Sequence, residues 1–205
     1  MLVAIVDYGL GNLRSVAGAV ERAGHVPIVS SDSAELARAD KLILPGVGAF
    51  GDGMKNLKAR GLVEPLTDLV MGRGRPILGI CLGAQLMART GSEFGTHTGL
   101  GWIDAAVEPL HVPAESSLRV PHVGWNGLHL RRADPLFANI PGDALFYFVH
   151  SFCLRCATRN LVQAECEYGR LFPAVIHRDN IYGTQFHPEK SQRHGLRLIE
   201  NFLSS

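Results

Sequence analysis

Hydrophobic residues in the first half of the chain alternate between two periods. Residues 2–6 form a continuous apolar run, which is typical of a strand buried on both faces of a parallel sheet, and residues 26–29, 41–44 and 76–80 predict three further strands. The segments between them have apolar residues at helical spacing and predict four helices: one that Asn12 caps and Gly24 ends, one that begins at Ser33, one over residues 53–71 and one that follows Cys81. This alternation predicts βαβ units in a doubly wound sheet, with strand 26–29 at its edge because it contains Pro27.

The second half of the chain is richer in strand-like segments. These cover residues 105–107, 127–130, 145–148, 161–166, 174–177 and 181–185. A last helix is predicted over residues 195–203. No linker, repeat or low-complexity block separates the halves, so we predict one α/β domain over residues 1–205. Its sheet should be mixed, mostly parallel and flanked by helices.

Composition and charge narrow the classes of function. Hydrophobic residues make up 46% of the 205 residues and charged residues 19%, which predicts a sizeable buried core. The 20 Lys and Arg residues against 19 Asp and Glu give a net charge of +1, which disfavours a nucleic-acid-binding surface or a polybasic membrane anchor. The first apolar run stops at Asp7, too early for a signal sequence or a membrane span, and the four cysteines do not resemble a secreted disulfide framework. We therefore expect a cytoplasmic protein that binds neither nucleic acid nor membranes.

The sequence Gly-Ile-Cys-Leu-Gly at residues 79–83 lies between the fourth predicted strand and a helix. This is the nucleophile-elbow pattern with Cys81 in the serine position, and its two glycines permit a tight turn that presents the sulfur at the carboxyl edge of the sheet. The positive end of the following helix favours a thiolate, and the backbone N–H of Leu82 would face an oxyanion formed on a carbonyl that Cys81 attacks. The alternative is a buried inert cysteine, and the flanking glycines favour the nucleophile.

A cysteine nucleophile needs a base, and His187 and Glu189 are suitable residue types. They are two apart, so on extended backbone they project to the same side, and Pro188 favours that conformation. Glu189 would orient the imidazole while His187 moves a proton to the leaving group. With Cys81 they predict a Cys-His-Glu triad.

The sequence Pro-Gly-Val-Gly at residues 45–48 follows the third predicted strand, where the crevice loops of doubly wound sheets gather. Its glycines allow the backbone N–H of Val47 or Gly48 to turn toward the site and complete an oxyanion hole with Leu82. An ordinary strand–helix turn explains the same residues equally well.

No motif indicates a metal or a cofactor. Residues 7–13 follow the first strand and are glycine-rich, but Arg14 stands where a dinucleotide-binding fingerprint has its third small residue. The Cys153 and Cys156 pair lacks a second paired half-site, so packing is favoured over zinc binding.

Taken together, these motifs resemble the class I (triad) glutamine amidotransferases, and within them the subfamily of glutaminase subunits that serve imidazole glycerol phosphate synthase. The elbow and the His-Pro-Glu sequence are shared by the whole class, and the last three of the matching segments single out the subfamily. The matching segments are residues 7–13 (DYGLGNL), 44–48 (LPGVG), 79–83 (GICLG), 121–126 (PHVGWN), 147–151 (YFVHS) and 186–191 (FHPEKS).

This resemblance implies a flavodoxin-like fold and the hydrolysis of glutamine to glutamate and ammonia through a thioester on Cys81, with His187 as base and Glu189 as its orienting partner. No cofactor is implied. Other residues match the family's contacts to glutamine, namely Gly46, Gly48, Gln85, Glu93, Ser151 and Phe152. Ala84 replaces a frequent Met and Phe152 a frequent Tyr, which changes little if the contact at residue 152 is made by the main chain.

The resemblance also implies a heterodimer with a cyclase subunit that is a (β/α)8 barrel. Ammonia would pass through the barrel to a distant site, where PRFAR is converted to imidazole glycerol phosphate and AICAR in histidine biosynthesis. Trp125, Tyr147 and Lys190 match positions near that interface. By spacing alone, the two aromatic residues could equally belong to the core.

Two alternatives stay open at this point. A paralogous amidotransferase subunit that feeds another pathway, such as that of a nonulosonic-acid sugar, would share Lys190 and Ser191. A non-catalytic DJ-1-like cysteine module would share the elbow but would not need His187 and Glu189.

Overall fold

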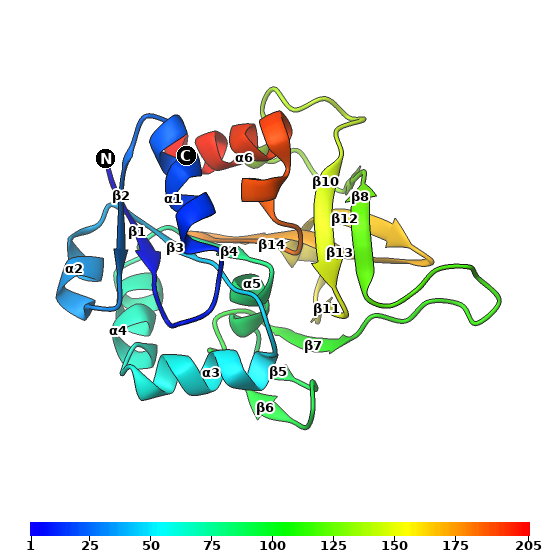
Figure 1. The fold of residues 1–205 in the computed structure, drawn as a ribbon, viewed down its shortest axis with the longest axis horizontal. Helices are drawn as coiled ribbons and strands as arrows, with labels where there is room; N and C mark the ends of the chain where they lie inside the picture. The colour runs from blue at the N-terminus through cyan, green and yellow to red at the C-terminus, as the bar shows by residue number, and fades with distance from the viewer.

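A mixed β-sheet of eight strands runs through the computed structural model, which describes residues 1–205 (Figure 1). In spatial order its strands are β2 (Val26–Ser30), β1 (Leu2–Val6), β3 (Lys41–Leu44), β4 (Ile77–Ile80), β14 (Ile181–Thr184), β13 (Arg170–Arg178), β12 (Val162–Tyr168) and β9 (His129–Leu130). The first five strands are parallel to one another, and the last three continue the sheet in antiparallel fashion. The predicted α/β fold with a mixed sheet is confirmed.

Two smaller sheets lie beside the main one. One pairs β8 (His122–Asn126) with β10 (Phe146–His150) in antiparallel fashion, and these strands run side by side in Figure 1. The other contains β11 (Phe152–Cys156), β7 (Ala105–Pro109), β5 (Thr90–Gly91) and β6 (His97–Thr98). The short strands β5, β6, β8 and β11 were not predicted from the sequence.

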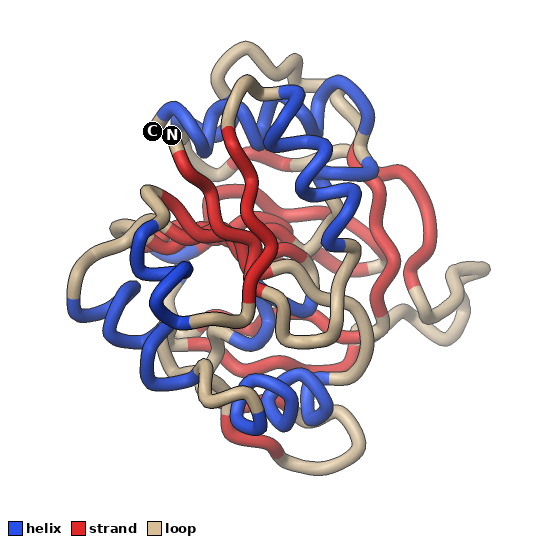
Figure 2. The backbone as a smooth tube through the Cα atoms, turned by 60° about the vertical axis from the view of Figure 1, so that its left-hand side comes forward, coloured by secondary structure: helices blue, strands red, loops and turns tan.

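Helices cover both faces of the main sheet, with α1 and α6 on one face and α2 to α5 on the other (Figure 2). Their bounds are α1 (Leu13–Arg22), α2 (Ser33–Arg38), α3 (Phe50–Ala59), α4 (Val63–Thr67), α5 (Leu82–Leu86) and α6 (Gln192–Ser204). Because both faces are covered, the parallel strands must be apolar on both sides, which explains their continuous hydrophobic runs.

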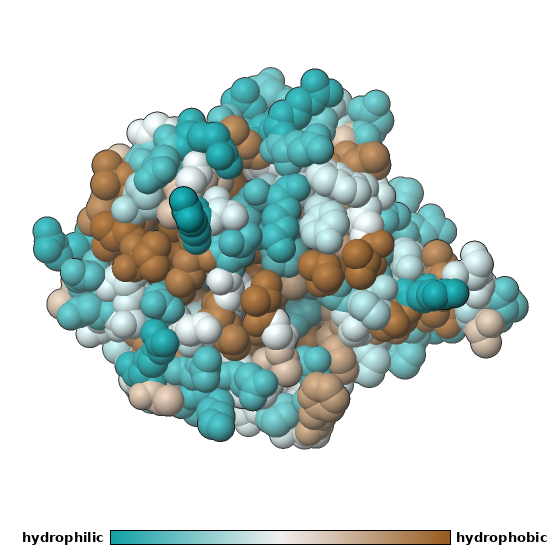
Figure 3. Space-filling model, viewed as in Figure 1, coloured by the Kyte–Doolittle hydropathy of each residue, from teal (hydrophilic) through white to brown (hydrophobic).

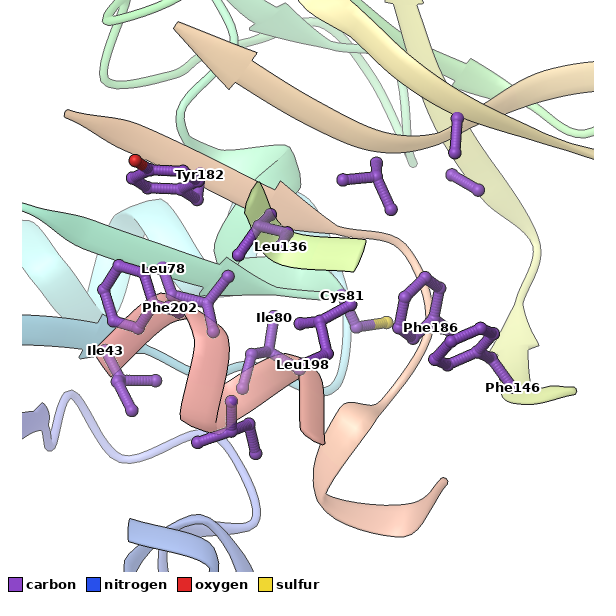
Figure 4. Packing of buried hydrophobic residues seen from close by; sticks show 14 of the residues in the cluster. Ile43, Leu78, Ile80, Cys81, Leu136, Phe146, Tyr182, Phe186, Leu198 and Phe202 are labelled. Atoms are coloured by element: carbon purple, nitrogen blue, oxygen red, sulfur yellow. The ribbon is translucent and has the colours of Figure 1, made fainter. Parts of the chain in front are cut away.

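Each face of the sheet has its own hydrophobic core. Figure 4 shows the core beneath α6, where side chains of the central strands and of the helix meet; among them are Ile43, Leu78, Ile80, Leu198 and Phe202. All five are fully buried. Full burial of such a side chain contributes about 2 kcal/mol, so this packing holds α6 firmly against the sheet.

The neighbouring strands β4 and β14 bring distant parts of the sequence together. Ile80 lies opposite Thr184 in the parallel register, and the N–H of Cys81 donates to the Thr184 carbonyl oxygen over 2.7 Å. The residue after β4 and the loop after β14 therefore meet at the carboxyl edge of the sheet, where α/β folds place their sites.

Two local expectations were wrong. Residues 53–71 do not form one helix, because Gly61 has a φ of +63° and separates α3 from α4, which then continues into a π-helical turn at Asp68–Gly72. Asn12 precedes α1, but its side chain makes no capping hydrogen bond.

Strand β2 lies at an open edge of the main sheet, as its proline predicted. The Val26 N–H donates to the Met1 carbonyl oxygen on the β1 side, so the next residue, Pro27, faces the open edge with its nitrogen. Val26 and Val29 are exposed there, and apolar side chains gather over this part of the molecule in Figure 3.

None of the helices is both long enough and apolar enough to cross a membrane.

Candidate active site

Cys81 occupies the turn between β4 and α5 in a strained backbone conformation. Its φ is +52° and its ψ is −111°, a combination that a residue other than glycine rarely adopts. In Figure 4 its sulfur points toward Phe186, the residue before His187. The side chain is 7% exposed, so the sulfur is nearly enclosed yet still reaches the neighbouring cavity.

The two glycines of the elbow are required by close packing. A Cβ at Gly79 would lie 2.6 Å from the Cα of Ala84, inside the contact distance of any real side chain. A Cβ at Gly83 would overlap the carbonyl oxygen of Leu44 and lie 2.7 Å from its carbonyl carbon. The first turn of α5 is therefore packed directly on the backbone of β3 and β4.

A cavity of about 550 Å³ opens beside the Cys81 sulfur. Most of the site residues predicted from the sequence line it; these are Val47, Gly48, Cys81, Leu82, Gln85, Glu93, Ser151, Phe152, His187 and Lys190. The prediction missed other lining residues, including Phe94, Pro121, Val149 and His150. His150 lies within a segment noted in the sequence, but only the pairing of β8 with β10 shows which way it points.

His187 in the cavity wall and Glu189 behind it form a buried pair. Nδ1 of His187 lies 2.8 Å from Oε1 of Glu189, and their side chains are 2% and 1% exposed. The contact does not run along extended backbone as predicted, because Pro188–Lys190 form a 3-10 turn that carries the carboxylate back to the ring. His187 itself is extended, with φ −98° and ψ 95°.

The environment of His187 favours its protonated form. Burial alone would lower the pKa of His187, but the neighbouring Cys81 sulfur and the Glu189 carboxylate outweigh burial and raise the pKa to about 9. The other ring nitrogen, Nε2, is buried and has no hydrogen-bond partner. That nitrogen is free to exchange a proton with a group bound at Cys81.

The loop at residues 45–48 has unused donors. The backbone N–H groups of Val47 and Gly48 make no hydrogen bond within the chain, and both residues line the cavity. Gly46 does not line it. A Cβ on Gly46 would collide with the hydroxyl of Tyr8, which is itself buried without a partner.

Two polar side chains in the cavity wall are oriented by the backbone. Oε2 of Glu93 accepts the Phe50 N–H at the start of α3 over 2.9 Å, which leaves Oε1 for a ligand. Nε2 of Gln85 donates to the carbonyl oxygen of Phe152 over 2.8 Å. Carboxylate and amide oxygens in this position suit a ligand that carries an ammonium group.

The predicted interface residues lie together on the surface next to the cavity. The rings of Trp125 and Tyr147 are 5.7 Å apart, and Nζ of Lys190 lies 6.0 Å from the centre of the Tyr147 ring. Trp125 is 42% exposed, so it is a surface residue and not part of the core.

The other three cysteines are free thiols away from the cavity. Burial raises the pKa of Cys153 and Cys156 to about 11 and that of Cys166 to about 12. Thiols in such surroundings are protonated at neutral pH and chemically inert.

Comparison with known proteins gives a consistent result. Residues 4–205 match the glutamine amidotransferase class-I family. The chain is 46% identical to imidazole glycerol phosphate synthase subunit HisH 1 of Campylobacter jejuni subsp. jejuni serotype O:23/36 (strain 81-176), over 98% of each chain. It is 47% identical to imidazole glycerol phosphate synthase subunit HisH of Brucella abortus (strain 2308), over 99% of this chain and 98% of that one.

Solved structures share the fold at lower identity. A crystal structure of glutamine amidotransferase superposes with a TM-score of 0.76 at 21% identity and covers 98% of this chain and 97% of that chain. The structure of PurLQS from Thermotoga maritima gives a TM-score of 0.73 at 19% identity, with coverage of 99% and 97%.

Proposed function

The chain belongs to the class-I glutamine amidotransferase family, and we propose that it works as the glutaminase subunit of an imidazole glycerol phosphate synthase in histidine biosynthesis. The observation that carries this proposal is that Cys81 and His187 line one cavity while Glu189 contacts the far side of the His187 ring. A redox-sensing module would have no use for this buried His–Glu pair.

The first chemical step is attack on the substrate amide. The Cys81 sulfur adds to the side-chain carbonyl carbon of glutamine, and the carbonyl oxygen becomes an oxyanion. The N–H of Leu82, at the start of α5, and the unused N–H of Val47 or Gly48 are the donors that would stabilise that charge. One such donor is worth about 10²- to 10³-fold in rate.

Collapse of this intermediate requires a proton on the leaving nitrogen. With a pKa of about 9, His187 carries a proton at neutral pH and can donate it from Nε2, so the C–N bond breaks and ammonia leaves. A glutamyl thioester remains on Cys81. His187 then accepts a proton from water as the water attacks the thioester, which releases glutamate and returns Cys81 and His187 to their starting states.

A more specific part of the proposal concerns the partner subunit and the surface that binds it. We propose that the exposed cluster of Trp125, Tyr147 and Lys190 contacts a (β/α)8-barrel cyclase subunit and that ammonia passes into the barrel. Transfer through a closed passage makes chemical sense, because ammonia in water is protonated and loses its nucleophilicity. Trp and Tyr are also the residues enriched at the centres of protein interfaces.

The test is to replace Cys81 with alanine. In complex with a cyclase subunit, the variant should lose glutamate release from glutamine but keep synthesis supported by added ammonium salt. Cys156→Ala is the matched control, because this cysteine lies outside the cavity, and it should keep both activities. Equal loss of both activities in the Cys81 variant would contradict the proposal. If the chain stimulates only another synthase, the alternative of a paralogous subunit is correct.

A further inference from the structure

Two histidines that the chemistry above does not use lie buried at the cavity, His150 in its wall and His122 behind His150. His122 of β8 and His150 of β10 are directly opposite in the antiparallel register, and Nδ1 of His122 lies 3.1 Å from Nε2 of His150. His122 is fully buried and His150 is 6% exposed. Burial lowers the pKa of both rings, that of His150 to about 4, so both are neutral near pH 7. Each ring therefore carries one N–H.

Counting these protons fixes the direction of each hydrogen bond in the network that links Asn126, His122, His150 and Phe152. Nδ1 of His150 lies 2.9 Å from the carbonyl oxygen of Phe152, which only accepts, so the single proton of His150 is on Nδ1. Nε2 of His150 must then accept from Nδ1–H of His122. That leaves Nε2 of His122 as an acceptor. The Asn126 atom 2.9 Å from it is Oδ1, so the amide must be turned by 180° to present its NH₂ group there. Each group therefore donates to the next in one direction, from Asn126 to His122, from His122 to His150 and from His150 to the Phe152 carbonyl oxygen.

Aromatic packing holds the two rings in place. The His122 ring is stacked between Tyr168, at a centroid distance of 3.9 Å, and Phe148, at 4.9 Å. The His150 ring lies 5.0 Å from Phe172. With both faces of His122 covered, the ring cannot turn to exchange its nitrogens without opening this packing.

This hydrogen-bond network ends at the substrate cavity. The Phe152 carbonyl oxygen accepts from His150 and also from Nε2 of Gln85, so both of its lone pairs are used. The second hydrogen on Nε2 of Gln85 is directed to Oε1 of Gln185 over 3.1 Å. Gln85 can therefore offer only its oxygen to a ligand.

We propose that His122 and His150 are positioning residues that fix the Phe152 carbonyl and thereby orient Gln85, so that its Oε1 and the Glu93 carboxylate receive the α-ammonium group of the substrate. This proposal rests on the proposed function, because it specifies how the amino acid is recognised. It assigns the pair to the binding of glutamine and not to the breaking of its amide bond.

The first test measures the protons directly. In ¹⁵N-labelled protein at pH 7, the imidazole shifts should show both rings neutral and both protonated on Nδ1. This measurement needs no activity, so its outcome does not depend on the proposed function. A proton on Nε2 of His150, or a charged ring, would overturn the assignment.

The second test measures binding by calorimetry in a Cys81→Ala background, with the cyclase subunit bound. His122→Leu should weaken the binding of glutamine about tenfold but leave glutarate monoamide, which lacks the amino group, nearly unchanged. His122→Asn, which keeps an amide donor near the position of Nδ1, should recover part of the loss. His129→Leu on the exposed strand β9 is the control and should bind as the parent does.

The outcomes separate the two proposals. Equal weakening of both ligands by the His122 substitutions would mean a purely structural role and would overturn the inference. Absence of glutamine binding in the parent and control proteins would instead count against the proposed function. If His122→Leu does not fold, the proton assignment and the Asn variant still decide the question.

Discussion

The packing of α5 on β3 makes Gly83→Ala the most demanding test of how the elbow is built. The new methyl group would overlap the Leu44 carbonyl oxygen and lie 2.7 Å from its carbonyl carbon, where ordinary contacts are about 3.4 to 4 Å. The first turn of α5 would have to move by about 1 Å. Overpacking of this size costs about 1 to 3 kcal/mol of folding stability, and a 1 Å misplacement of a reacting group costs about 10²-fold in rate.

Urea denaturation and glutamate release from the complex would measure both effects. Gly18→Ala is the matched control, since Gly18 is inside α1 and a Cβ there meets nothing within 4 Å. This control should gain about 0.5 to 1 kcal/mol from helix propensity and keep full activity. A Gly83 variant as stable and as active as the parent would show that the elbow is not held by this contact.

Three further substitutions have expected outcomes. Glu189→Gln removes the charge next to His187, so the pKa of His187 should fall well below about 9 in an NMR titration. An unchanged pKa would mean that Glu189 does not stabilise the protonated ring. Tyr8→Phe removes a buried hydroxyl that has no partner, so the free energy of unfolding should rise by about 1 kcal/mol, and a loss would reveal a hidden partner. Asp134→Asn removes the carboxylate that lies 2.6 Å from Nδ1 of His177. Because the pKa of Asp134 is lowered from 3.8 and that of His177 is raised from 6.5, the pair stabilises the folded state most at pH values between 3.8 and 6.5. The stability loss, about 2 kcal/mol at pH 5 to 6 by urea denaturation, should shrink as the pH rises through the raised pKa of His177 and as it falls through the lowered pKa of Asp134.

The features that could be predicted from the sequence are those encoded by neighbouring residues. Strands β1, β3 and β4 each have a continuous apolar run, and the glycines around Cys81 indicate a tight turn without any tertiary information. The combination of Cys81 with His187 and Glu189 was predicted from the elbow pattern and from the spacing of His187 and Glu189, and the closeness of these residues depends on β14 lying beside β4.

The features that were missed depend on pairing across the fold. Strand β8 contains Gly124 and alternates only weakly between buried and exposed residues, so its sequence resembles a loop until it is paired with β10. The contact between His122 and His150 exists only through that pairing. The unpartnered hydroxyl of Tyr8 likewise becomes visible only when the loop containing Gly46 is folded over it.

The open edge at β2 bears on whether strands of other molecules can pair with the sheet at high protein concentration. The N–H groups of Val26 and Ile28 are directed to β1, and Pro27 has none, so Val29 carries the last outward amide hydrogen of this strand. A strand from another molecule would find one outward donor where this strand would otherwise offer two, which weakens pairing at this edge. The missing hydrogen makes the exposed valines Val26 and Val29 part of a poorer template for edge-to-edge pairing.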